Sequence, residues 1–484
     1  MAIFAFLTEF NLPNATTWFY FSLLLVIALF FKFTRLLSMR NWDLLALFLL
    51  APGFLLIQDA SHLKASIYST PRTPEEIAAI KSTVQSLTIY GYVWLISASG
   101  YWLIRCIVDL AMIRRPALST NLNFSGLAWL AIALFAFLTV VAFRPNRDEF
   151  GPVGRGPIAL QQVEEGAAKL VSTSQLVSEP QDPESQRNIR FWVSRSVSMT
   201  CHLAILVGLV MIGWRHFGDP TTGMAMAAMH VLLPYTAFMV GQVHHILPAA
   251  LILWAVFTFR HPGLSGLLLG VAAGSSFFPL LLFPLWCGFF WNRGATRFSC
   301  MFVLAAVMSL SMTGVVLWWQ GQLQQVIQEL WLQHDWQPWK IPQNESIWTG
   351  VHWAYRMPVF IAFLAMWIVG TFWPAPKNLA QLVAQTAVIL LGIQFWYTDQ
   401  GGRYVLWYLP LLTVLVFRPN LAEMRPSLAT SERDWMVRWR KAITSRIRGT
   451  EPSVSTVEVR QTAIRTPVKS NSGVQKSWSE STSG

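Results

Sequence analysis

Long runs of apolar residues recur along this chain, separated by short polar segments. An α-helix needs about 20 apolar residues to cross the hydrocarbon core of a bilayer, and most runs are close to that length. The pattern predicts an all-α, polytopic transmembrane helical bundle of about 11–13 spans, one of them broken. The predicted spans are residues 17–34, 42–57, 86–104, 123–143, 196–214, 223–240, 246–259, the broken 263–291, 298–319, 350–373, 379–397 and 403–417.

The run over residues 263–291 is too long for one crossing. A single helix of this length would measure about 43 Å, against a hydrocarbon core of roughly 30 Å. Polar residues and a proline interrupt it at 274–279, so we predict two half-length helices that fold back to the same side. Irregular backbone at membrane depth is tolerated only where protein covers it or where it lines a wet cavity. The pattern therefore predicts a re-entrant helix pair beside a polar cavity.

The distribution of charge orients the predicted bundle. Lys and Arg concentrate in the short loops on one side, which the positive-inside rule makes cytoplasmic. The N-terminus then lies outside and the C-terminus in the cytoplasm, with a transmembrane domain over residues 1–418 and long outer loops at 58–85, 144–195 and 320–349. Residues 419–448 are basic and amphipathic, which predicts an interfacial segment, and the Ser/Thr-rich residues 449–484 are predicted to be a disordered cytoplasmic tail.

The bulk composition supports a membrane protein over other classes. Of 484 residues, 54% are hydrophobic and only 12% are charged. The net charge of +12 follows from the basic inner loops and tail, so it does not indicate a partner nucleic acid. None of the four cysteines has zinc-binding spacing.

Candidate catalytic chemistry gathers at the outer side of the predicted bundle. A group that deprotonates an acceptor hydroxyl must be a positioned carboxylate or imidazole, and Arg can grip a phosphate with two hydrogen bonds. Adjacent histidines on a helix point about 100° apart and suit joint metal binding poorly. An Arg inside a span either faces a cavity or reaches back to the surface. The outer polar residues are Asp59, His62, Asp148, Glu149, Gln242, His244, His245, His334, Asp335, His352, Arg356, Asp399 and Arg403.

The block over residues 241–291 resembles that of bacterial membrane glycosyltransferases of the GT-C fold, especially the polyprenol-phosphate-mannose-dependent α-1,2-mannosyltransferase-like group. The resemblance rests on a Gly-Gln opening, a basic-Pro-Gly turn, a Gly-rich helix and a proline break. A Gly-Gly-Arg-Tyr sequence before the last span, with a following proline, also resembles the closing span of such enzymes. Two features depart from the pattern: the Asp59 segment lacks the family's tyrosines, and Ser275 or Ser276 replaces a lysine. The matching residues are Gly241, Gln242, Pro262, Gly263, Gly266, Gly270, Pro279, Arg403, Tyr404 and Pro410.

The resemblance implies an integral hexosyltransferase of the inner (plasma) membrane that moves a mannose-like sugar from a polyprenyl-phosphate donor. The acceptor would be a glycan or a lipid on the outer face, and membrane lipid would surround the spans. In that fold the catalytic carboxylate follows a span, which points to Asp59, or failing that Asp148 or Glu149. The expected substrate-binding residues are Gln242, His244, His245, Arg356 and Arg403. The sequence indicates no metal site, and a requirement for a divalent cation stays open.

Two other classes compete with the enzyme interpretation. A multi-pass transporter would place ionisable residues near mid-membrane, where His202 and His230 are the candidates. A non-catalytic membrane protein of the same fold would explain the missing lysine and tyrosines. Transfer of sugar by purified protein would separate the first class from the other two.

Overall fold

The computed structural model describes residues 15–69, 73–112, 120–143, 183–291, 293–319, 321, 323–324, 338–339, 345–398 and 400–426, and every regular element within them is helical. The first half contains α2 (Ala15–Phe30), η1 (Phe33–Arg35), α3 (Met39–Ala46), α4 (Ala51–Ser69), α5 (Pro74–Asp109), α6 (Phe124–Ala142), α8 (Pro183–Ile212), η2 (Gly213–Phe217), α9 (Pro220–Leu232), α10 (Pro234–Phe238) and α11 (Val243–Phe257). The second half contains α12 (Pro262–Ser275), η3 (Phe278–Leu282), α13 (Phe283–Phe289), α14 (Ala295–Trp319), η4 (Trp353–Tyr355), α16 (Met357–Phe372), α17 (Leu379–Trp396), η5 (Val405–Trp407) and α18 (Leu409–Phe417).

Seven helical stretches in the described part of the chain are long and apolar enough to cross a membrane. Shorter apolar helices, which include α11 and α12, complete the bundle between them. The chain is therefore an integral multi-pass membrane protein, as the hydrophobic pattern predicts. The seven stretches are Met39–Ile67, Pro74–Asp109, Phe124–Ala142, Phe191–Phe217, Ala295–Trp319, Trp353–Phe372 and Leu379–Trp396.

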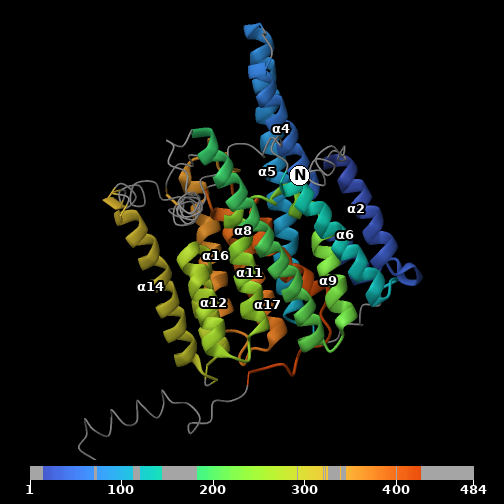
Figure 1. Cartoon of the computed structure of the whole chain (residues 1–484), viewed down its shortest axis with the longest axis vertical. Helices are drawn as coiled ribbons and strands as arrows, with labels where there is room; N and C mark the ends of the chain where they lie inside the picture. The colour runs from blue at the N-terminus through green and yellow to red at the C-terminus, as the bar shows by residue number, and fades with distance from the viewer. Residues whose placement is uncertain are drawn as a thin grey trace, which may run out of the picture. The chain divides into compact units, whose positions relative to one another are not determined.

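The predicted outer loop over residues 58–85 is wrong, because α4 continues to Ser69 and α5 begins at Pro74. Figure 1 shows α4 and α5 projecting together above the other helices. A capping box starts α5: the Thr73 hydroxyl accepts from the Glu76 N–H, and the Glu76 carboxylate accepts from the Thr73 N–H. We call the end of the bundle from which this pair projects the upper end, and the end near Asp109 the lower end.

The span that begins at Met39 is interrupted at residues 47–50, just before Pro52. Proline lacks an N–H and so cannot continue the helical ladder from the preceding turn. Two indoles of α5 donate to carbonyls of this turn: Trp102 to Ala46 O at 3.0 Å, and Trp94 to Leu49 O at 2.6 Å. α5 thus supports a break that also keeps local backbone bonds, among them Ala51 N–H to Phe48 O at 3.0 Å.

The re-entrant pair predicted over 263–291 is present. Ser276 is extended (φ −150°, ψ 149°), α12 ends before it, and η3 with α13 leads the chain away again. A Cβ at Gly266 would collide with the carbonyl of Phe298, and a Cβ at Gly270 with that of Phe302. Because the residue numbers increase together in both helices, α12 and α14 run parallel and start at the same end. The chain must therefore return between them. Small residues permit this close approach of helix backbones.

The predicted span 223–240 is shorter than expected. Leu233 precedes Pro234 and takes an extended conformation, so α9 ends at Leu232 and the short α10 follows. The ring of proline disfavours the helical region for the residue before it, which accounts for the break. Of the predicted outer segment 144–195, residues 183–195 form the start of α8. The predicted amphipathic segment and tail over 427–484 lie outside the described residues.

Candidate functional site at the upper end

Three irregular segments of backbone meet towards the upper end of the bundle: the turn before α11, the break after α12, and the connection from α17 to α18. Aromatic rings join them. The His245 ring stacks on Tyr404 with centroids 4.7 Å apart and planes at 16°, and Tyr404 lies 4.2 Å from Trp407. Trp407 stacks on Phe278 at the re-entrant break, with centroids 3.5 Å apart. The re-entrant tip is thus built into the same cluster as the start of α11.

Arg403 lies within this cluster, close to both predicted histidines. Its side chain is only 5% exposed, and its positive charge acts on the rings of His244 and His245. The two imidazoles face each other with centroids 4.3 Å apart. The structure therefore brings together three of the predicted substrate-binding residues at the N-terminus of α11, the end of a helix that favours negative charge.

The Gly-Gly-Arg-Tyr sequence has a structural reason. Oε1 of Gln394 accepts the N–H groups of Gly402 (2.9 Å) and Tyr404 (3.3 Å), which fixes the backbone on either side of Arg403. A Cβ at Gly401 would lie 2.6 Å from the carbonyl oxygen of Gln394, and Gly402 has φ +98°, a conformation that L side chains rarely adopt. Glycine is required at both positions to present Arg403.

A second arginine, Arg195 on α8, was not predicted. Its guanidinium fills the space where a Cβ at Gly241 would lie, and its side chain is buried. The hydroxyl of Ser198, one turn along α8, donates to the carbonyl of Val240. The glycine of the Gly-Gln opening therefore admits a guanidinium from another helix. This contact joins residues far apart in the chain, and the position of Arg195 at the start of a span was the available signal.

Several buried polar atoms of the cluster have no hydrogen-bond partner among the described residues. Most are donors: Nε2 of Gln394, Nε1 of Trp407, Nε1 of Trp396 and the hydroxyl of Ser276. A buried donor without a partner costs about 1–3 kcal/mol, and such groups in native proteins call for an explanation. Together with Arg403, these donors suit a ligand or ordered solvent that supplies acceptor oxygens.

The other predicted site residues are placed differently. Asp59 was expected in a loop but lies within α4, where it is exposed and makes no hydrogen bond or ion pair to any described residue. Gln242 is half-buried and precedes α11 without capping it through its side chain. Arg356 lies near the start of the span Trp353–Phe372, at the N-cap of α16, and its Nε donates to the carbonyl of Pro338 at 2.7 Å. Asp148 and Glu149 lie outside the described residues, as do His334, Asp335 and Asp399.

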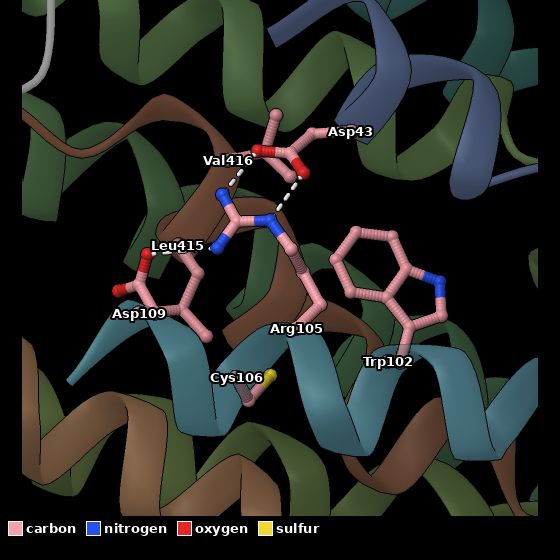
Figure 2. A pocket seen from close by; sticks show the side chains of 7 residues that line it. All are labelled: Asp43, Trp102, Arg105, Cys106, Asp109, Leu415 and Val416. Carbon is pink, nitrogen blue, oxygen red and sulfur yellow. Dashed lines mark hydrogen bonds and ion pairs between the residues drawn. The ribbon is translucent and has the colours of Figure 1, made fainter. Parts of the chain in front are cut away.

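The lower end holds a network of buried charges whose members come from three segments, and Figure 2 shows its members Asp43, Arg105 and Asp109. Arg105 on α5 pairs with Asp43 on α3 through two bonds of 2.6 and 2.7 Å, and with Asp109 at 3.3 Å. Asp109 in turn accepts from Arg418 at 2.6 Å. Of these contacts only that between Arg105 and Asp109 is local in sequence, one helical turn apart. Since each carboxylate meets a guanidinium, the network reads as structural.

A cavity of about 10 Å³ adjoins this network, room for about one water molecule. Trp102, Cys106, Leu415 and Val416 complete its lining (Figure 2). No group of three or more metal-binding side chains occurs among the residues that the structure describes. Comparison of the chain with protein-family models, with curated proteins and with solved structures found no match.

Proposed function

We propose that this chain is a glycosyltransferase of the inner membrane that takes a mannose-like sugar from a polyprenyl-phosphate donor. The observation that carries the proposal is the gathering of Arg403, His244 and His245 at the start of α11, beside the re-entrant break. A phosphate is the ligand that best suits an arginine, a helix N-terminus and a set of buried donors. The polyprenyl chain would lie among the spans.

The reaction assigned to the site is an inverting transfer. A carboxylate takes the proton from the acceptor hydroxyl, the acceptor oxygen bonds to the anomeric carbon, and the bond from that carbon to the phosphate oxygen breaks. Polyprenyl phosphate then leaves with the electron pair. Arg403 would hold the developing phosphate charge, which is the usual role of such donors in group transfer.

Asp59 is our choice for the base among the described carboxylates. Gly53 of α4 packs on Leu95, and Leu95 lies 3.2 Å from a Cβ built on Gly402. Asp59 lies six residues beyond Gly53, about 9 Å further along α4 towards its exposed end. An acceptor that reaches the cluster from the upper end would therefore pass Asp59.

Basic residues support a cytoplasmic assignment for the lower end. Arg40, Arg260, Arg293, Lys377 and Arg418 all lie in or beside connections at this end, as the positive-inside rule requires of cytoplasmic loops. The upper end and its cluster would then be non-cytoplasmic, where a glycan or lipid acceptor is available.

The proposal is tested by incubating the purified protein in lipid nanodiscs with radiolabelled polyprenyl-phosphate sugars and an acceptor mixture. Asp59→Asn should reduce transfer by roughly 10²–10⁴-fold, the usual contribution of a general base. Arg403→Gln should weaken donor binding. Glu75→Gln, a matched change at an exposed carboxylate of α5, should leave transfer unchanged. Absence of transfer from every donor would contradict the enzyme, and full activity of Asp59→Asn would contradict that base.

A multi-pass transporter is the second candidate, favoured by one observation. His202 and His230 are ionisable residues deep inside the bundle, 1% exposed each. Ionisable residues at membrane depth mark transport pathways in many membrane proteins. Uptake or release of solute by proteoliposomes, without sugar transfer, would support this function over the first.

A further inference from the structure

His202 on α8 and His230 on α9 lie next to each other, about 10 Å along α8 from Arg195 in the direction of the lower end. The ring centroids lie 6.5 Å apart with planes at 45°. His230 is ten residues from the start of α9 at the lower end, about 15 Å along the helix and thus near the middle of a 30 Å core. His202 lies near the centre of the span Phe191–Phe217. The pair therefore sits near the middle of the membrane.

All four ring nitrogens of this pair are buried and lack a hydrogen-bond partner among the described residues. A neutral imidazole carries one donor and one acceptor, so each ring leaves both unsatisfied. Such atoms cost about 1–3 kcal/mol each when buried. Two adjacent rings, each with both nitrogens unsatisfied, point to one ligand that binds to both rings.

The ring separation excludes a direct bond. A direct N–H···N bond of about 2.9 Å would bring the ring centres to roughly 5 Å. One bridging atom, bonded at about 2.8 Å to a nitrogen of each ring, places the centres roughly 6–6.5 Å apart. The observed 6.5 Å corresponds to one intervening atom.

The charged residues near the pair indicate whether this ligand is a cation or a neutral molecule. Helix α9 and the helices α2, α6, α11 and α18, which pack on α8 or α9, contain no Asp, Glu, Lys or Arg. The segment η2, which also packs on α9, carries Arg215, but this residue is exposed and lies 13 residues beyond His202. On α8 the nearest charged residue is Arg195, seven residues or about 10 Å away. A metal cation would have two neutral ligands and no counter-charge in an apolar core, whereas structural metal sites supply about four ligands. A neutral molecule is favoured.

We infer that His202 and His230 bind a single water molecule, which bridges α8 and α9 in the middle of the membrane. Water can donate to one ring and accept from the other, so it satisfies one nitrogen of each. It also makes this contact between α8 and α9 directional. The two histidines thus hold α8 and α9 together through a shared ligand. Their contributions to stability should therefore depend on each other.

A double-mutant cycle tests this coupling. His202→Leu and His230→Leu should each lower the melting temperature in detergent, because each leaves the other imidazole without its bridge. The double variant should recover most of the loss, since removing both polar partners is nearly neutral. His216→Leu serves as the control: its Nε2 lies 2.7 Å from Phe257 O, and its effect should add to that of His202→Leu.

Electron cryomicroscopy of the full-length protein at a resolution that shows water supplies the second measurement. We expect one density peak about 2.8 Å from a nitrogen of each ring, unchanged by a strong chelator, and no stoichiometric metal by elemental analysis. Additive single variants, a chelator-sensitive peak with bound metal, or rings in direct contact would each overturn the inference.

Discussion

The charged network of the lower end and the aromatic cluster of the upper end treat their buried polar groups in opposite ways. At the lower end, Asp43 and Asp109 are matched by Arg105 and Arg418, in bonds of 2.6 to 3.3 Å. At the upper end, buried donors of Gln394, Trp407 and Ser276 have no described partner. A matched network holds elements together, whereas unmatched donors lower stability unless something binds to them. The lower network has the features of structural polarity, and the unmatched donors are the ones to which the proposed function assigns a ligand.

The largest effect should come from breaking the lower network. Arg105→Ala leaves two buried carboxylates without their shared guanidinium, and removal of one partner of a buried pair typically costs about 3–5 kcal/mol. Lys64→Ala is the control, because Lys64 forms an exposed ion pair with Glu345 at 2.9 Å. Exposed pairs contribute about 0–1 kcal/mol. Thermal unfolding in detergent measures both, and equal losses would show that the network is not structural.

A smaller effect on stability is expected at Lys377, which lies at the lower end. Its Nζ donates to the carbonyl of Thr371 at 2.8 Å. Burial lowers the pKa of Lys377 from its ordinary value of 10.5 to about 8. Below pH 8 the folded and unfolded chains both hold the proton, and between pH 8 and about 10.4 only the unfolded chain does. Stability contributed by this group therefore rises with pH across that window.

Melting temperatures recorded from pH 7 to 10.5 check this dependence. Lys377→Met should remove the rise, whereas Lys81→Met, at an exposed position of α5, should retain it. Parallel curves for the wild type and Lys377→Met would show that this ammonium does not control the slope.

Prediction from the sequence succeeded where the signal was local: the break at Ser276 follows from a long apolar run with polar residues and a proline at its centre. That Arg403, His244 and His245 lie close together fits their positions at span ends, and their role in substrate binding stays a prediction. The loop over 58–85 failed for a physical reason: hydropathy marks where the hydrocarbon ends, not where the helix ends. Thr73 and Glu76 cap α5 in a polar segment that lies beyond the apolar run.

Long-range pairs escaped prediction altogether. The bond from Arg105 to Asp43 joins residues 62 positions apart, and nothing in the sequence near Asp43 marks it as a partner. The packing of Arg195 against Gly241 and the bond from Arg356 to Pro338 are of the same kind. Hydropathy predicts which residues lie at the same end of the spans. Helix packing decides which of those residues are in contact.

Two serines of α12 and its C-cap provide the finest test of the contrast between matched and unmatched polarity. Ser265 is buried and its hydroxyl lies within 3.0 Å of Thr258 O and 3.2 Å of Ala255 O, so Ser265→Ala should cost about 1 kcal/mol. Ser276 is buried at the re-entrant break with no described partner for its hydroxyl. Ser276→Ala should leave the melting temperature of the unliganded protein unchanged or raise it slightly.

The same pair of variants reports on binding. If the donors at the break contact a ligand, Ser276→Ala should reduce the rise in melting temperature that polyprenyl phosphate produces, while Ser265→Ala should retain that rise from a lower starting value. A loss of stability at Ser276 equal to that at Ser265, with no change in the ligand-dependent rise, would show that the hydroxyl is satisfied within the protein. The donors of the upper end would then be structural, and the contrast between the two ends would fail at its most accessible position.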